Sequence, residues 1–165
     1  MELHELAKRM IDESKGILHD IDHLLRVWSF ARLIGQQGGL EPETQYLLEA
    51  AALTHDIACP YCRERYGNTN GKHQEREGER LIRKFLAGTD MLPDCVERIV
   101  YLVGHHHTYS DVCGMDHQIL LEAGFIANAI ENGYSRKKVS AFFQKICRTA
   151  SGRLLMESLF QMCED

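Results

Sequence analysis

The sequence lacks most of the features that mark membrane, secreted and nucleic-acid-binding proteins. Its 165 residues include three prolines and one tryptophan, and no apolar run approaches the length needed to cross a bilayer. The net charge of -5 and the scattered basic residues give no reason to expect a nucleic acid polymer as partner. Residues 1–16, MELHELAKRMIDESKG, are amphipathic with acidic residues throughout, unlike a signal or transit peptide. We therefore expect a cytoplasmic protein with no membrane partner.

Length and composition fit one domain. A content of 44% hydrophobic and 26% charged residues is ordinary for a globular protein of this size with a single core. No internal repeat, low-complexity tract or interdomain linker interrupts the chain. Six cysteines without an export signal predict reduced thiols rather than a disulfide framework. Residues 1–165 are expected to form a single domain.

Helical periodicity runs through most of the chain. Apolar side chains recur every three or four residues at Ile17, Ile21, Leu24, Trp28, Ala31 and Ile34. This helix, predicted over 16–36, stops before Gly38, which suits a C-cap. The segment 43–57 is richer in Ala and Leu and predicts a more deeply buried helix, followed by a loop from Pro60 to Gly71. Further helices are predicted over 74–87, 93–103, 117–131, 136–147 and 151–163. The fold class is therefore all-α.

Nine histidines are present, and most of them are clustered. The clusters are His19 with His23, His55 beside Asp56, His73, and the run of His105, His106 and His107. His23 lies in an otherwise apolar stretch, and His55 with Asp56 ends the most hydrophobic helix, where unpaired polar groups are costly to bury. Coordination of a cation by imidazoles from neighbouring helices would remove that cost. A lone helical histidine is usually an ordinary hydrogen-bonded residue, so the prediction rests on the joint pattern.

The CPYC motif that follows His55 and Asp56 offers a competing chemistry. Cys59 and Cys62 have the spacing of a thioredoxin-like redox pair, but the residues before them are Ala-rich and helical rather than a strand. Structural zinc would need a second close pair, and the other four cysteines are single and widely separated. We interpret Cys59 and Cys62 as loop residues that partly cover a neighbouring metal pocket.

Five stretches occur in an order that is more specific than any one of them. They are HDIDHLLRVWSFARLI, LLEAAALTHDIA, NGKHQEREGERLIRKFL, YLVGHHHTYSD and DHQILLEAGFIANAIENG. Together they closely resemble the HD-domain superfamily of metal-dependent phosphohydrolases, over nearly the whole chain. The resemblance implies an all-α, single-domain helical bundle of the HD-domain type. It also implies a divalent metal ion, and mixed imidazole and carboxylate ligands suit Mn, Fe, Ni, Co or Zn, with Mg as a further option.

The resemblance implies a first metal site. His23 matches the first metal ligand of the family, while His55 and Asp56 match the pair that names it. Asp56 is expected both to bind the metal and to help orient the attacking water. His19 belongs to a second HD dipeptide and lies one turn before His23, where it can face the same pocket and support a ligand or contact substrate.

The resemblance leaves a second metal open. In two-metal members further histidines bind the second cation, and His105 or His106 fits one of those positions. His73 fits the other poorly, because it precedes Gly78 by five residues where the family has four, and Gln74 occupies that place. The number of metal ions is therefore one or two.

Gly124 is the largest departure from the family pattern. The family normally carries an Asp at this position, within LLEAGFIANA, and that Asp closes the first metal site. Glu122 lies about 200° round the helix and cannot take the same place without distortion. Asn128, one turn later, points roughly the right way, and water is a third option. The glycine has two explanations, close helix packing or a tolerated loss of function.

Two functions from different classes follow. The first is a metal-dependent phosphohydrolase acting on a small phosphorylated metabolite or nucleotide. Arg26, Lys72 and Arg76 are its candidates for neutralising substrate phosphate, and Arg26 is favoured because it lies almost one turn after His23. The alternative is a degenerate, non-catalytic HD domain that binds metal or nucleotide as a sensor or scaffold. The apolar positions of 142–163 suit core packing, which is favoured, or a homodimer face.

Overall fold

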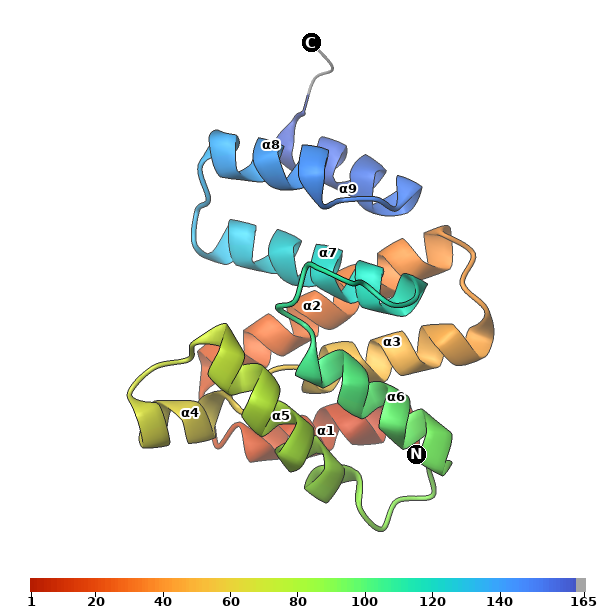
Figure 1. Ribbon diagram of the computed structural model, residues 1–165, viewed down its shortest axis with the longest axis vertical. Coiled ribbons are helices and arrows are strands. Elements are labelled where there is room, and N and C mark those ends of the chain that lie inside the picture. The colour runs from red at the N-terminus through yellow and green to blue at the C-terminus, as the bar shows by residue number, and fades with distance from the viewer. Residues whose placement is uncertain (163–165) are drawn as a thin grey trace.

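Nine α-helices and no strand make up residues 1–162, the part of the chain that this computed structural model describes (Figure 1). They are α1 (Leu3–Glu13), α2 (Leu18–Gln37), α3 (Pro42–Thr54), α4 (Cys59–Tyr66), α5 (Gly71–Leu86), α6 (Pro93–Gly104), α7 (Met115–Glu131), α8 (Arg136–Lys145) and α9 (Ala150–Phe160). The all-α prediction is confirmed. The last residue of the helix predicted over 151–163 lies outside the described residues. Within them, no helix has both the length and the apolar character needed to span a membrane.

The three prolines begin helices rather than ending them. Pro42 and Pro93 are the first residues of α3 and α6, and Pro60 is the second residue of α4. Proline is tolerated there because the first N–H groups of a helix have no partner within it. The loop predicted from Pro60 to Gly71 is therefore wrong over its first half. Helix α4 ends at Gly67, whose φ of 67° is the left-handed conformation that glycine adopts without strain.

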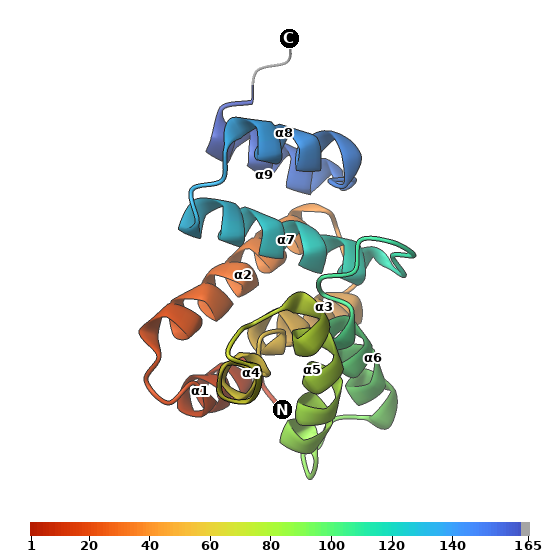
Figure 2. The same cartoon turned by 60° about the vertical axis from the view of Figure 1, so that its left-hand side comes forward.

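Two buried apolar clusters hold the helices together. One gathers side chains from α2, α3, α7, α8 and α9 with Leu102 of α6, and the other from α1, α3, α5 and α6 with Leu24 of α2. Helix α3 contributes to both, with Ala51 and Ala52 in the first cluster and Ala50 and Leu53 in the second. In both views α7 lies between α2 and the pair formed by α8 and α9 (Figures 1 and 2). The C-terminal end of α3 is thus fixed in the interior.

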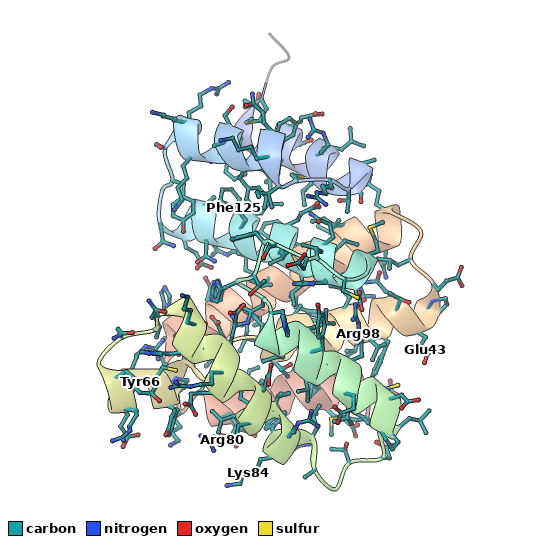
Figure 3. All side chains as sticks on the ribbon, in the orientation of Figure 1. Glu43, Tyr66, Arg80, Lys84, Arg98 and Phe125 are labelled. Carbon is teal, nitrogen blue, oxygen red and sulfur yellow. The ribbon has the colours of Figure 1, made fainter. Side chains whose placement is uncertain are left out.

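The C-terminal helices are packed on α7 rather than left as a free apolar face. Phe125 of α7 stacks on Phe142 of α8 with ring centroids 3.7 Å apart, in the space between these helices (Figure 3). Met156 of α9 is fully buried in the same cluster. Core packing, the favoured interpretation of this segment, is therefore observed for Phe142 and Met156.

A buried carboxylate fixes α7 to the connection between α8 and α9. Glu122 is fully buried and accepts hydrogen bonds from Gln118 Nε2 at 2.8 Å and from the backbone N–H groups of Arg148 and Thr149 at 2.8 and 3.0 Å. The Thr149 hydroxyl donates a fourth, at 2.5 Å. These donors satisfy the charge without a cation. Glu122 therefore acts as a helix anchor and does not fill the ligand position left open by Gly124.

Candidate metal centre

Imidazoles from three separate helices meet one carboxylate in the interior. His23 lies within α2, His55 caps α3, Asp56 follows it, and His106 comes two residues after α6. His23 Nε2 lies 3.2 Å from His55 Nε2, and Asp56 Oδ2 lies 3.5 Å from both nitrogens. On the other side of the carboxylate, Asp56 Oδ1 lies 3.5 Å from His106 Nε2. The structure thus brings together four of the six residues named as candidate metal ligands, which are His23, His55, Asp56 and His106.

Backbone carbonyls fix the orientation of two of these imidazoles. His55 Nδ1 lies 2.8 Å from the carbonyl oxygen of Ala52, and His106 Nδ1 lies 2.7 Å from that of Val103. A carbonyl oxygen only accepts, so each Nδ1 must carry the proton and donate it. In the neutral ring the Nε2 atom then keeps its lone pair. Both histidines therefore direct an unprotonated nitrogen toward Asp56.

His23 is oriented in the same way by an acidic partner. Its Nδ1 lies 2.7 Å from Oε2 of Glu131, the last residue of α7. A hydrogen bond donated to a carboxylate again leaves Nε2 unprotonated on the neutral ring. Glu131 is a residue of the site that the sequence analysis missed.

The three donor atoms have the spacing that a bound cation requires. A triangle with sides of 3.2, 3.5 and 3.5 Å contains a point about 2 Å from all three corners, which matches metal–nitrogen and metal–oxygen bond lengths of about 2.0–2.2 Å. Two imidazole lone pairs facing each other at 3.2 Å otherwise repel, and a cation between them converts that repulsion into coordination. The donor set of His23, His55 and Asp56 therefore fits a divalent metal ion.

A second donor set shares the same carboxylate. Asp56, His106 and His107 offer one ligand atom each within 4.8 Å of one another. The amide oxygen of Gln74 lies 3.3 Å from His106 Nε2 and 3.2 Å from His107 Nε2. Gln74 stands where the family pattern places a histidine, and a neutral amide oxygen is a weaker ligand for these metals than imidazole. Asp56, His106 and His107 would hold a second ion, with the amide of Gln74 in place of the usual imidazole.

Burial sets the protonation of the centre. It lowers the pKa of His55 to about 4 and, together with the neighbouring His106, lowers the pKa of His107 to about 3. Burial opposes ionisation of Asp56, but the surrounding imidazoles of His55, His106 and His23 outweigh it and hold the pKa of this carboxyl well below its usual range. Near neutral pH, His55 and His107 are therefore neutral and Asp56 is ionised, the forms in which these residues bind metal.

Gly124 leaves open space in the wall of the cavity that contains this centre. The cavity has a volume of about 230 Å³ and is also lined by Asn128 and Glu131. A Cβ added at Gly124 would meet no heavy atom within 4 Å, whereas one at Gly78 would meet Val103 Cγ1 at 2.9 Å. Close packing therefore explains Gly78 and does not explain Gly124. Asn128 donates from Nδ2 to the Gly124 carbonyl at 2.9 Å, so the acceptor end of its amide is the part left to serve as a weak ligand.

Three other histidines proposed for the site lie at its edge or outside it. His19 lines the mouth of the cavity with 75% of its side chain exposed. His105 stacks on Tyr101 at 4.2 Å and donates from Nδ1 to the Tyr101 carbonyl. His73 lies against the ring of Tyr66, also at 4.2 Å, and its buried Nδ1 has no hydrogen-bond partner. The structure does not bring His105 or His73 to the cavity.

The predicted phosphate-binding cations also lie away from the cavity. Neither Arg26 nor Lys72 nor Arg76 lines it, and Arg63 is the one lysine or arginine that does so within residues 1–162. Arg63 belongs to α4, in the segment where a loop was predicted. It donates two hydrogen bonds, of 2.8 and 2.5 Å, to the carboxylate of Asp20, a residue of the second HD dipeptide.

The two cysteines of the CPYC motif are buried residues of α4 rather than loop residues. Cys59 lines the cavity, and Cys62 is fully buried. Burial raises the pKa of both thiols, which keeps them protonated and poorly nucleophilic. Neither is in a disulfide, and the same is true of Cys95, Cys113 and Cys147.

Comparison with known proteins agrees with this architecture. The family model named HD domain matches residues 20–129 of the sequence, about two thirds of the chain. The protein belongs to the HD-domain family. Its fold is similar to the crystal structure of a predicted HD superfamily hydrolase from an uncultured Thermotogales bacterium, with a TM-score of 0.68 and 19% sequence identity, over 96% of this chain and 83% of that one. No functionally curated protein matches the chain. Members of the superfamily are generally metal-dependent hydrolases, and the HD-type bundle inferred from the motifs is confirmed.

The metal-free protein is expected to lose stability as the pH falls from about 6.5 to about 4. The unfolded chain binds protons at His55 and His107 near the ordinary pKa of 6.5, whereas the folded chain resists doing so until pH 4 or below. In this range each such histidine contributes a slope of up to about 1.4 kcal/mol per pH unit. Urea unfolding of chelator-treated protein at a series of pH values measures this slope of the unfolding free energy. His55→Asn should flatten the slope, and the exposed control His4→Gln should keep it; equal slopes in all three proteins would contradict the assignment.

Proposed function

We propose that this protein is a metal-dependent phosphohydrolase that acts on a small phosphorylated metabolite or nucleotide. The observation that best supports the proposal is the convergence of three Nε2 atoms, from His23, His55 and His106, on the carboxylate of Asp56. Burying such a cluster of polar atoms is costly unless each atom has a partner. A cation provides the compensation.

The proposed chemistry uses one or two divalent ions, of Mn, Fe, Ni, Co, Zn or Mg. A cation held by this donor set supplies polarisation of a phosphoryl oxygen and a bound water of lowered pKa. Asp56 is placed both to ligate and to accept a hydrogen bond from the attacking water. A volume of about 230 Å³ lies below the range of about 300–1,000 Å³ typical of drug-sized ligands, which favours a small substrate or the phosphorylated end of a larger one.

Arg63 takes the place proposed for Arg26 in phosphate recognition. Its guanidinium lines the cavity and is 39% exposed, while the carboxylate of Asp20 that it grips is 10% exposed. A phosphate presents the same paired acceptor oxygens as that carboxylate and can engage the remaining donors of the fork. The Asp20 contact holds the guanidinium at the cavity mouth before substrate arrives.

The open wall at Gly124 favours the second candidate, a non-catalytic HD domain that binds metal or nucleotide as a sensor or scaffold. The carboxylate that normally completes the site is absent, and the described structure offers only the amide of Asn128 nearby. The two candidates share the metal centre and differ in turnover.

Screening phosphoesters with added Mn²⁺, Co²⁺, Ni²⁺ or Mg²⁺ tests the enzyme directly. We expect metal-dependent release of phosphate, reduced at least about 100-fold in His55→Ala because a ligand is lost. Metal binding without turnover of any phosphoester supports the sensor instead. A protein that takes up none of these ions, by elemental analysis after exposure and gel filtration, overturns both candidates.

Replacing Arg63 by Gln should raise KM for the phosphoester about tenfold or more, with a smaller change in kcat, because the cation acts in binding the phosphate. Steady-state kinetics at saturating metal measure the split. Arg65→Gln is the matched control, since Arg65 is an exposed neighbour on α4 that does not line the cavity. An unchanged KM in the Arg63 variant would remove this residue from substrate binding.

Gly124→Asp should tighten metal binding about tenfold or more, because the added carboxylate enters open space beside the centre. Gly124→Ala is the control that adds the Cβ and the helix propensity of about 1 kcal/mol without the ligand. Calorimetric titration of both metal-free variants separates the two effects. Equal metal affinities of the Gly124→Asp and Gly124→Ala variants would show that a side chain at this position does not reach the metal.

A further inference from the structure

We propose that Glu131 is a positioning residue of the metal centre, which orients His23 and supplies through it the negative charge that Gly124 cannot provide. The inference rests on the proposed metal centre and extends it to a residue to which the sequence analysis gave no role. Glu131 does not contact the metal position itself in this arrangement; it acts on the far nitrogen of a ligand.

Helix geometry places Glu131 on the same side of α7 as the missing ligand. Seven residues separate Gly124 from Glu131, and at about 100° per residue this is two turns less about 20°. Both residues line the same cavity. The Glu131 side chain starts two turns after Gly124 and is one methylene longer than the aspartate that the family has there. It therefore enters the same cavity from a point further along the helix.

The contact with His23 differs from the corresponding contacts of the other two imidazoles. His55 and His106 donate from Nδ1 to neutral backbone carbonyls, whereas His23 donates to the Glu131 carboxylate at 2.7 Å. A charge-assisted bond of this kind is stronger, and it raises the basicity of the opposite nitrogen, Nε2, as a metal ligand. Of the three imidazoles around Asp56, His23 is thus the one whose ligand strength is increased by an anion.

The second oxygen of Glu131 argues against a purely structural role. Oε1 is buried and has no hydrogen-bond partner, although the whole side chain is only 11% exposed. Arg26 Nε forms an ion pair with this oxygen at 3.7 Å, a distance too long for a hydrogen bond, and Arg26 also donates to Asp22 at 2.8 Å. Glu122, the structural anchor on the same helix, accepts four hydrogen bonds. Oε1 of Glu131 lacks such donors, and a cation bound on the other side of His23 would add to the favourable charge that Arg26 provides.

Titration of metal-free protein with Mn²⁺ tests the proposal, by calorimetry and by the electron paramagnetic resonance signal of the free ion. Glu131→Ala should weaken Mn²⁺ affinity about 10- to 100-fold, the usual cost of losing a group that supports a ligand. Glu131→Gln keeps an acceptor for His23 Nδ1 but removes the charge, so its loss should be smaller than that of Ala. Asp12→Asn is the control, because it removes an exposed carboxylate that pairs with Lys8 and does not line the cavity, and its affinity should equal that of the wild type.

Adding Gly124→Asp to Glu131→Gln tests the charge argument separately. If Glu131 supplies the missing charge, the added Asp should recover most of the affinity lost in Glu131→Gln. A gain from the Asp that is the same in the wild-type and Gln backgrounds would overturn that part, because the two carboxylates would then be independent.

The possible failures are distinguishable. A wild-type protein that binds no Mn²⁺ overturns the metal centre, and the role of Glu131 with it. A wild type that binds Mn²⁺ together with Glu131 variants of equal affinity overturns the role of Glu131 alone. Reduced unfolding free energy of metal-free Glu131→Ala with unchanged Mn²⁺ affinity identifies a structural link between α2 and α7 and also overturns it; the Gln variant decides the matter if the Ala variant does not fold.

Discussion

The buried approach of two imidazole lone pairs at the end of α3 is the constraint on which the rest of the centre depends. His55 cannot take a second proton easily, because burial lowers its pKa to about 4, and its first proton is committed to the Ala52 carbonyl. The Nδ1 atom of His23 is likewise bonded to Glu131. The two Nε2 atoms face each other at 3.2 Å, and when both rings are neutral their lone pairs repel. A cation between them, with Asp56 as counter-charge, would turn that contact into an attractive one.

The packing of α3 explains why this contact cannot relax. Its alanines and leucines enter both apolar clusters, so the helix is covered on opposite sides. Moving the His55 end would require moving residues of α1, α5 and α6 on one side and of α2 and α7 on the other. Interiors packed in this way do not deform by small amounts at little cost. Apolar contacts therefore fix the position of the His55 end of α3, and hydrogen bonds fix the orientation of the imidazoles.

Three positions of α7 have different roles near the metal centre. Glu122 binds the connection between α8 and α9, and Gly124 leaves the family's ligand position open. Glu131, two turns beyond Gly124, meets His23 from outside the centre. The helix thus keeps one carboxylate in contact with a histidine of the site, although the carboxylate expected at position 124 is absent.

The sequence by itself determined seven of the nine helices in the described chain and the residue types of the centre, and it missed α1 and α4. Periodicity of apolar residues depends on neighbours within a few turns, and His23, His55 and Asp56 were recognisable because they interrupt apolar helices where burial is costly. The place of Gln74 and the gap at Gly124 were visible only through the resemblance to the HD-domain family.

Only the tertiary structure decided which polar side chains face the cavity. His105 and His106 are adjacent in the sequence, yet the end of α6 turns one onto Tyr101 and the other toward Asp56. Arg63 and Glu131 carry no local signal, because Arg63 is held by Asp20 and Glu131 by His23, partners 43 and 108 residues away. Such pairings are set by how distant helices pack against one another, and that arrangement is a property of the whole core rather than of any stretch of the chain.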